Sequence, residues 1–458
     1  MVAAKPQGPT SAVASVRKVA LAGFLGSVIE WYDFTLYGVA AALVFKATFF
    51  PSLDPLNGTL AAFATFGLGF FARPLGGILL GNRADKIGRT KVLVASLVLM
   101  GVATVLIGAL PSYQSIGVAA PVLLVALRLL QGVGAGGELG PAATMVAEYA
   151  PDDKRGFYAS LVGSGVALGV GLAAGTFALV GRVMSDAAFL DWGWRIPFLL
   201  SAVMVAVALY IRLRIGETPV FEAITKTNTA AAAPAVEVFR TYRKNFLVAV
   251  GGRFAEVGPT YVFNTFALSY VAANLGSATR SAALTGVTIA GALGIITIPA
   301  FGALSDRVGR RPVFIAGSVF VGLIAFPFFW LLNTGSAAAI WFAFILAIPL
   351  GVYVMFAVQC SYYPELFGTR ARASGMSLAR ELTAPLIAGT SPFVAAALVA
   401  WTGSYWPVAG TIVLYAAISA ISVYLGDETR GQNLALAWPE EERRLTEAAN
   451  RGGAAARL

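Results

Sequence analysis

The sequence contains no histidine and a single cysteine, Cys360. Without histidine the chain cannot build a His-ligated metal site, a Ser-His pair or a Cys-His pair. One cysteine excludes an intrachain disulfide and a zinc site made from several cysteines. Charged residues are also scarce, because they make up 12% of the 458 residues, against about 25% in soluble domains. So few charges cannot cover the surface of a large soluble protein.

Apolar residues are abundant instead. They form 58% of the chain, and the mean hydropathy is +0.76. A membrane span needs about 20 mostly apolar residues. The sequence predicts twelve such spans, at residues 19–45, 58–81, 92–110, 119–148, 157–181, 196–215, 246–272, 282–304, 313–332, 337–362, 374–400 and 405–425. We expect all of them to be helices. Apolar and polar residues do not alternate as they would in a strand, and the backbone groups of an open strand would have no hydrogen-bond partners in lipid.

The basic residues predict how the chain is oriented. With the N-terminus in the cytoplasm, 25 of the 33 Lys and Arg residues fall on the inner side, 4 fall outside and 4 lie within spans. This asymmetry follows the positive-inside rule and places both termini in the cytoplasm. It also accounts for the net charge of +10 through contact with the lipid bilayer, so no nucleic acid is expected as a partner.

A polar stretch divides the chain into two similar parts. Residues 216–245 are predicted to form a cytoplasmic linker between six-helix bundles at 19–215 and 246–425, with cytoplasmic tails at 1–18 and 426–458. We therefore expect an all-α membrane protein of twelve transmembrane helices in two pseudo-symmetric bundles.

Two repeated motifs support this division. The loop residues Gly81, Asp85, Gly88 and Arg89 recur as Gly302, Asp306, Gly309 and Arg310. Two Glu-Arg pairs, each seven residues apart, also correspond: Glu148 with Arg155, and Glu365 with Arg372. Such repeats predict two halves related by an axis along the membrane normal. We assign Arg73 a gating role, with helix packing and substrate contact as open alternatives, and we interpret the repeated residues as gating groups that clamp helices in one state. The alternative is that they only satisfy the positive-inside rule.

Charged residues inside spans are expensive and indicate function. Glu30, Asp33 and Tyr37 share one face of the first span, and Arg128, Gln131 and Glu138 share one face of the fourth. At about 1.5 Å per residue, Asp33 and Arg128 lie at a similar depth, so we expect them to pair. If the arginine moves away, the carboxylate takes up a proton. Glu30 is the second candidate proton carrier, and a static structural ion pair is the alternative.

The seventh span carries a polar stripe. Arg253, Glu256 and Asn264 follow helical spacing, with Tyr261 nearby, which indicates one wall of a substrate cavity. The alternative is that Arg253 and Glu256 only neutralise each other's charge and take no part in substrate binding. Pro259 permits a kink in this span. Arg380 and Glu381 are adjacent and point about 100° apart, so we expect one to line the cavity and the other to contact a neighbouring helix. The predicted substrate-binding residues are Tyr37, Gln131, Glu138, Arg253, Glu256, Tyr261, Asn264, Arg380 and Glu381.

The repeated loops and twelve spans resemble the major facilitator superfamily. The segments Glu30-Trp31-Tyr32-Asp33-Phe34, Arg73-Pro74-Leu75-Gly76-Gly77, Trp192-Gly193-Trp194-Arg195 and Glu217-Thr218-Pro219-Val220-Phe221-Glu222 resemble its metabolite:proton symporter family, most of all the shikimate transporter branch. The resemblance implies the major facilitator fold. It also implies proton coupling between an acid of the first span and an arginine of the fourth, which match Asp33 and Arg128.

Together these features predict a monomeric carrier in the bacterial inner membrane. It would take up a small carboxylated metabolite, such as shikimate or a related organic acid, with protons and by alternating access. No cofactor is expected beyond the proton gradient. Symport of a zwitterionic osmolyte such as betaine or proline is the alternative. A drug exporter is less well supported, because it predicts a Gly-Pro motif that the fifth span lacks. A membrane sensor would need a larger soluble domain than residues 216–245 provide. No set of residues arranged for catalysis indicates an enzyme.

Overall fold

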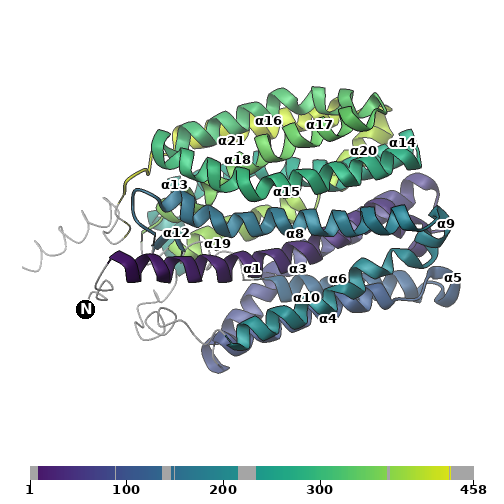
Figure 1. Ribbon diagram of the computed structural model, residues 1–458, viewed down its shortest axis with the longest axis horizontal. Coiled ribbons are helices and arrows are strands. Elements are labelled where there is room, and N and C mark those ends of the chain that lie inside the picture. Colours follow the sequence, from purple (N-terminus) through teal and green to yellow (C-terminus); the bar gives the residue numbers. More distant parts are fainter. Residues whose placement is uncertain are drawn as a thin grey trace, which may run out of the picture.

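The helices lie side by side along the long axis of the molecule (Figure 1). The computed structural model describes residues 9–87, 89–136, 146–148, 150–214, 234–368, 372–432 and 434, and the side chains of most of them. No strand occurs within these ranges. We call residues 9–214 the first half and residues 234–434 the second half.

Six long helices form the described first half: α1 (Pro9–Leu43), α3 (Pro55–Ile87), α4 (Arg89–Ala109), α6 (Ala119–Ala135), α8 (Arg155–Val183) and α10 (Arg195–Arg214). Short elements, which are α2 (Phe45–Phe49), α5 (Tyr113–Ile116), α9 (Asp186–Ala188) and η1 (Phe189–Gly193), connect them at one end of the bundle. Each of the first six predicted spans overlaps one long helix, although α1 and α3 extend several residues beyond the apolar stretch. The fourth predicted span runs past the end of α6, and its residues 137–145 lie outside what the structure describes.

The second half begins with the short helix α12 (Pro234–Thr241) and then repeats the pattern. Its six rods are α13–η2–α14 (Arg243–Tyr261, Val262–Phe266, Ala267–Leu275), α15 (Ser277–Val308), α16 (Arg310–Asn333), α17–η3–α18 (Ala337–Ala347, Ile348–Val352, Tyr353–Glu365), α19–η4–α20 (Arg372–Thr383, Ala384–Ala388, Ser391–Thr402) and α21 (Trp406–Leu425). These match the last six predicted spans.

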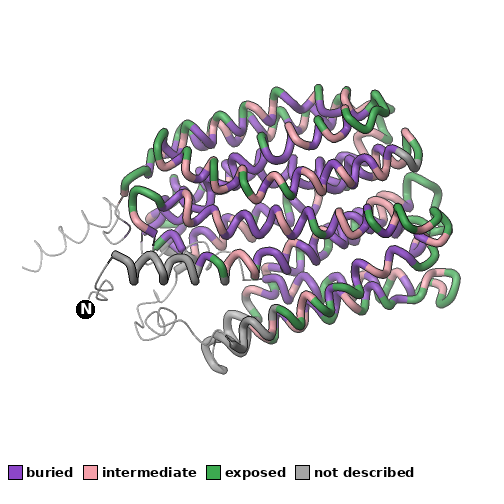
Figure 2. The backbone as a smooth tube through the Cα atoms, in the orientation of Figure 1, coloured by how far each residue is buried: buried purple, intermediate pink, exposed green. Residues whose placement is uncertain are grey.

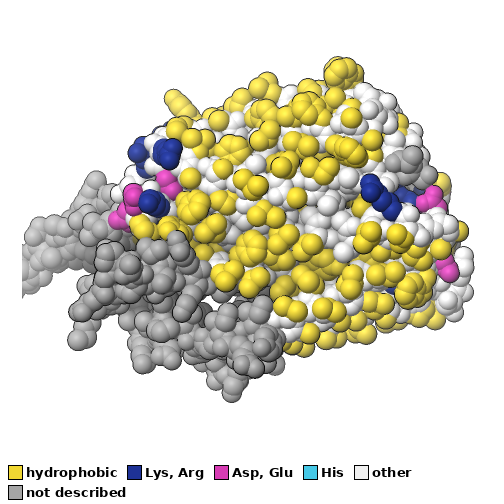
Figure 3. All heavy atoms as spheres, viewed as in Figure 1, with side chains coloured by type: hydrophobic (Ala, Val, Ile, Leu, Met, Phe, Trp, Pro, Cys, Tyr) yellow, Lys and Arg dark blue, Asp and Glu magenta, His cyan; other side chains and the backbone are white. Residues whose placement is uncertain are grey.

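The face shown in Figure 3 carries apolar side chains across its middle and charged side chains near its two ends. Within the described residues, seven helices are long and apolar enough to cross a membrane, and Asp186–Gly193 with Arg195–Val207, bent by 44°, would make an eighth. Buried residues line the inward sides of the helices and exposed residues lie on their outer sides (Figure 2). Large apolar side chains such as Leu323 and Trp330 are exposed there, as expected for contact with lipid.

Glycines allow the two halves to pack closely. A Cβ atom on Gly291 of α15 would lie 2.5 Å from Cα of Gly171 on α8. One on Gly67 of α3 would lie 2.7 Å from the carbonyl oxygen of Gly389, next to η4. Small residues let helix backbones approach in this way. These contacts hold α8 against α15 and α3 against the rod α19–η4–α20.

Three rods of the second half contain a π-helical turn, and each turn lies near a proline. Pro349 and Pro385 lie within η3 and η4, and Pro259 lies in the last turn of α13, just before η2. Proline cannot donate a backbone hydrogen bond, so the regular helical pattern changes there. The interruption expected at Pro259 is thus present as a π-helical turn, and π-turns inside helices often mark functional sites.

Candidate functional site

Arg73, near the middle of α3, joins the two halves. Its Nη2 atom lies 3.5 Å from Glu30 Oε1 on α1 and 3.6 Å from Glu381 Oε1 on α19. The guanidinium group also lies over the ring of Phe34, 5.2 Å from its centroid. A buried arginine between carboxylates of different halves forms an ion cluster that must break when the halves separate. The structure therefore brings together three residues to which the sequence assigned separate roles.

Asp33 is fully buried and contacts two hydroxyl groups. Ser201 Oγ donates to its Oδ1 atom at 2.7 Å, and Thr104 Oγ1 donates to its Oδ2 atom at 3.1 Å. Gln131 completes a chain to Arg128, because its Nε2 atom donates to Thr104 at 2.8 Å and its Oε1 atom accepts from Arg128 Nη1 at 2.5 Å. The prediction of a direct Asp33–Arg128 pair is wrong for this conformation, since two side chains lie between them.

Aromatic rings and a backbone carbonyl hold Arg128 in this position. Its Nε and Nη2 atoms donate to the carbonyl of Phe66 at 3.3 and 3.1 Å. Its guanidinium carbon lies 4.1 Å from the ring centroid of Tyr37 and 5.0 Å from that of Phe34. Cation–π contacts of this kind stabilise a desolvated arginine. Gly69 provides the space, because a Cβ atom there would lie 2.3 Å from Arg128 Nε.

Tyr37 and Gln131, two of the predicted substrate contacts, therefore both contact Arg128. Tyr37 is fully buried, and its hydroxyl donates to Thr65 Oγ1 at 2.8 Å. Thr104 and Ser201 were missed by the sequence reasoning, because a single hydroxyl in an otherwise apolar helix is a weak signal. Only the packing of α10 against α1, and of α4 against α10 and α6, shows what they do.

On α13, Arg253 and Glu256 form the ion pair that the sequence analysis gave as the alternative, with 3.4 Å between Nη1 and Oε2. The pair does not satisfy itself, because Arg253 also binds two other helices. Its Nε atom donates to Thr383 Oγ1 at 2.6 Å, and its Nη1 atom donates to Gln359 Oε1 at 3.2 Å. Arg253 is thus part of a polar network across α13, α18 and α19.

Two small cavities lie between the halves, beside this network. The first is lined by Trp31, Val166, Val170, Glu256, Thr260, Asn264, Tyr353 and Phe356. The second is lined by Val162, Gly163, Val166, Phe356, Gln359, Cys360, Met376 and Arg380. Each has a volume of about 10 Å³, which is room for about one water molecule. A substrate would need the halves to move apart at this point.

The remaining predicted cavity residues lie close by. Tyr261 stacks on Trp31 across the two halves, with ring centroids 6.3 Å apart and an interplanar angle of 15°. Arg380 lines the second cavity while its neighbour Glu381 reaches Arg73, so the adjacent pair does point to different partners. Glu138 and Gly88 lie outside what the structure describes, as do the surroundings of Gly81 and the side chains of Asp85 and Arg89.

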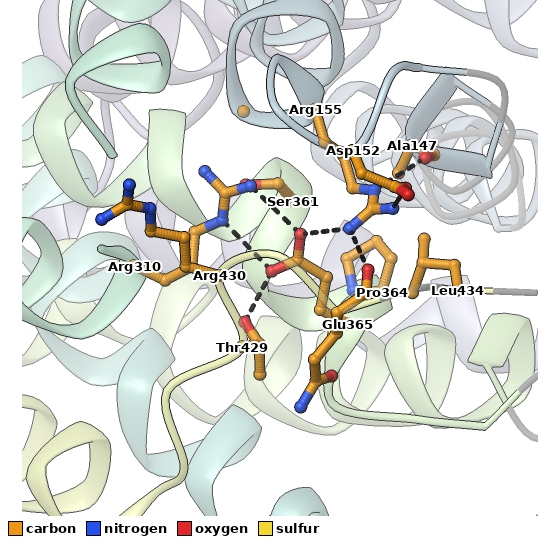
Figure 4. Close-up of polar contacts among 12 residues, drawn as sticks. Ala147, Asp152, Arg155, Arg310, Ser361, Pro364, Glu365, Thr429, Arg430 and Leu434 are labelled. Atoms are coloured by element: carbon orange, nitrogen blue, oxygen red, sulfur yellow. Dashed lines mark hydrogen bonds and ion pairs between the residues drawn. The ribbon is translucent and has the colours of Figure 1, made fainter. Parts of the chain in front are cut away.

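A second polar cluster ties the halves together at the end of the bundle where α1 begins, which we call the basic end (Figure 4). Glu365, at the end of α18, is fully buried. Its Oε1 atom lies 3.1 Å from Nη1 of Arg155 and 3.1 Å from Nη2 of Arg310. Its Oε2 atom accepts hydrogen bonds from Arg310 Nε at 3.1 Å and from Thr429 Oγ1 at 2.5 Å.

The repeated Glu-Arg pairs exchange partners between the halves. Arg155 of the first half binds Glu365 of the second, and Arg372 of the second binds Glu148 of the first at 2.6 Å. Each arginine also donates from Nε to a carbonyl eight residues earlier in its own half. The repeat therefore forms a reciprocal clamp, which the sequence spacing alone did not predict.

The repeated loop of the second half contributes to the same clamp. Asp306 accepts hydrogen bonds from the backbone N–H groups of Gly156 and Phe157 at 2.8 and 2.9 Å, at the positive start of helix α8. It also accepts from Arg310 Nη1 at 2.7 Å. Gly309 has φ of +117°, which explains why this loop position is glycine.

The chain after α21 crosses the basic end. Besides Thr429, the carboxylate of Glu428 accepts from the backbone N–H of Arg310 at 2.8 Å. The carbonyl of Gln432 accepts from Arg155 at 2.9 Å, and the carbonyl of Leu434 accepts from Arg372 at 3.0 Å. Sequence reasoning gave this segment only the role of a tail.

The opposite end of the bundle is also bridged, but by groups that are less buried. Arg280 of the second half forms an ion pair with Asp186 of the first, whose side chain is 55% exposed. Arg182 Nη2 lies 3.4 Å from Thr285 Oγ1. Both ends are therefore closed in this conformation, with the stronger closure at the basic end.

A bundle of two similar halves, with buried charges between them and a clamp at one end, is the architecture of a carrier. The profile of the Major Facilitator Superfamily matches residues 23–384. The chain belongs to this superfamily. It is a multi-pass membrane transporter and not an enzyme.

Its similarity to the shikimate transporter, expected from the motifs, is confirmed. The shikimate transporter of Escherichia coli (strain K12) is 40% identical over 428 residues, covering 93% of this chain and 98% of that protein. The proline/betaine transporter of the same organism is 36% identical over 434 residues, covering 93% and 86%. Among solved structures, the xylose transporter from E. coli in a partially occluded inward open conformation has a TM-score of 0.69 at 16% identity and covers 92% of this chain and 99% of that one. The latter likeness shows the major facilitator fold.

Proposed function

We propose that this transporter takes up a small carboxylated metabolite, such as shikimate or a related organic acid, together with a proton. The buried carboxylate of Asp33 carries the proposal. Hydroxyl groups surround it, and no arginine lies in direct contact with it in the described structure. A carboxylate without a salt-bridge partner in an apolar helix bundle is readily neutralised by a proton.

The balance of charge at the centre supports an anionic substrate. Four arginines lie between or beside the halves, Arg73, Arg128, Arg253 and Arg380, against four carboxylates, Glu30, Asp33, Glu256 and Glu381. When one carboxylate takes up a proton, the described centre gains one positive charge. A substrate carboxylate neutralises that charge, and arginine binds carboxylates in a bidentate manner. Proton and substrate would then cross the bilayer together as a neutral set.

In the proposed cycle Asp33 is protonated from the outer side, and Arg128 reorganises through Gln131 and Thr104. Loading breaks the Arg73 cluster and the clamp at the basic end, so the halves rock and release substrate inward. The 25 inner basic residues support a cytoplasmic position for the basic end and both termini. We further propose that the carrier works as a monomer in the bacterial inner membrane and needs no cofactor beyond the proton gradient.

Symport of a zwitterionic osmolyte is the second candidate, and the proline/betaine transporter at 36% identity is the observation that favours it. The mixed arginines and carboxylates of the centre would also suit a substrate with both charges.

Uptake into proteoliposomes separates the candidates. With acid outside, the unmodified protein should accumulate shikimate, and a protonophore should abolish accumulation. Asp33→Asn should lose accumulation yet keep exchange of substrate across the membrane, since exchange needs no net proton movement.

Asp54→Asn is the matched control, because Asp54 is exposed in a connection outside the bundle. Full accumulation by Asp33→Asn would overturn the coupling, and accumulation of betaine alone would establish the second candidate.

A further inference from the structure

Besides Glu256 Oε2, which faces Arg253, three buried polar atoms at the first cavity have no hydrogen-bond partner in the described structure. They are Nε1 of Trp31, Oδ1 of Asn264 and Oη of Tyr353, and all three residues line the cavity. Asn264 and Tyr353 are 5% and 3% exposed. Buried polar groups in proteins are nearly always paired, so an unpaired set around one cavity indicates a ligand that completes it.

The second cavity adds a cation. The guanidinium of Arg380 lines it and forms no hydrogen bond or ion pair within the described residues, unlike Arg73, Arg128 and Arg253. The two cavities share the wall residues Val166 and Phe356, so they adjoin. One ligand can therefore reach Arg380 with one end and the three unpaired atoms with the other once the halves move apart.

We propose that the substrate is a hydroxylated ring carboxylate that lies across both cavities, with its carboxylate on Arg380 and its hydroxyl groups on Trp31, Asn264 and Tyr353. This inference rests on the proposed function and names its substrate class. A hydroxyl group both donates and accepts, so it can satisfy the indole N–H, the amide oxygen and the phenol alike. The rings of Trp31 and Phe356 form apolar walls for the carbon ring.

A quaternary ammonium group fits these observations less well. It offers no hydrogen bond, so all three polar atoms would stay unpaired, and a site built to bond hydroxyls rejects ligands that lack them. The charge of Glu256, the one carboxylate on the cavity wall, is offset by Arg253 at 3.4 Å. One face of Trp31 is also covered by the stacked ring of Tyr261.

Equilibrium binding to the purified full-length protein tests the inference with two probes. Shikimate carries ring hydroxyls, and cyclohex-1-ene-1-carboxylate has the same ring and carboxylate without them. Trp31→Phe and Tyr353→Phe each remove one polar atom and keep an aromatic ring. Each should weaken shikimate binding about tenfold, the effect of one lost hydrogen bond, and leave binding of the second probe unchanged. Arg380→Gln should weaken both probes alike.

Control variants at rings outside both cavities, the exposed Trp330→Phe and the partly exposed Tyr113→Phe, should bind both probes as the unmodified protein does. If the unmodified protein binds both probes equally, or if the phenylalanine variants weaken both equally, the hydroxyl subsite is overturned while organic-acid transport stands. If the unmodified protein binds neither probe and binds betaine, the proposed function and this inference both fail.

Discussion

Arg155, at the start of α8 in the first half, binds Glu365, at the end of α18 in the second half, with 3.1 Å between Nη1 and Oε1. The two side chains are 1% and 0% exposed. Removing one partner of a buried pair leaves an uncompensated charge, which costs about 3–5 kcal/mol. Neither group can therefore stay buried without a partner, so separating them requires new contacts or water at both charges when the basic end opens.

Glu365→Gln should open the basic end, because Arg155 and Arg310 then lose their shared carboxylate. Cys360 reports this opening. It is the chain's one cysteine, it is 5% exposed, and it packs against Ala147 and Leu434 between the halves. We expect its alkylation rate to rise at least about tenfold.

The matched control is Lys244→Gln, which removes a surface ion pair with Asp427 at the same end. Exposed pairs contribute little, so its alkylation rate should stay unchanged. A thermal unfolding scan confirms that each variant is folded. An unchanged rate in folded Glu365→Gln would show that the clamp does not govern access to Cys360.

Thr104→Val should impair transport by cutting the hydrogen-bond chain between Asp33 and Gln131. A hydrogen bond to a charged group contributes about 1.5–3 kcal/mol, so proton-driven uptake should fall about tenfold or more. Thr104→Ser keeps the hydroxyl and should retain most of the activity. Equal uptake by the two variants would exclude a role for this hydroxyl.

Gly69→Ala should abolish uptake, because the added Cβ atom would lie 2.3 Å from Nε of the fully buried Arg128. Gly410→Ala in α21 meets no atom within 4 Å and serves as the control. Alanine is about 1 kcal/mol better than glycine inside a helix, so the control should keep its uptake and its thermal stability. Normal uptake by Gly69→Ala would mean that Arg128 can move aside freely.

Asp186→Asn should change initial uptake by no more than about twofold, since an ion pair with a solvent-exposed carboxylate contributes about 0–1 kcal/mol. Asp186 of the first half and its partner Arg280 of the second half lie at the end of the bundle opposite the basic end. Initial uptake into proteoliposomes measures the effect. A loss of uptake of about tenfold or more by folded Asp186→Asn would contradict the weaker closure at this end.

Twelve spans could be predicted, because each apolar stretch is long enough to cross a bilayer and lipid permits few other structures. The Glu-Arg repeat was also visible, yet its partners were not. Spacing along one helix says nothing about which helix lies opposite, so the exchange of Arg155 and Arg372 between halves appears only in the packed molecule.

Asp33 and Arg128 are a second case in which the sequence did not predict the contacts between helices. Matching depth made a direct pair reasonable, but depth does not fix the direction of a side chain. Gln131 lies between the two because α4 and α6 pack together and bring Thr104 within 2.8 Å of it. The unpaired atoms of Trp31 and Tyr353 likewise become a set only where α1 meets α18.

The sequence by itself determined the helices, the membrane belt, the two-fold repeat and the charges that lipid cannot tolerate alone. These follow from local composition, because burial of a charge or exposure of an apolar run has the same cost in any arrangement. The tertiary structure decided which charges meet, which carboxylate lacks an arginine and which polar atoms are left for a ligand. Those outcomes depend on distances between helices that are far apart in the chain. A difference of a few ångströms decides whether two charges form a direct ion pair or are joined through intervening side chains.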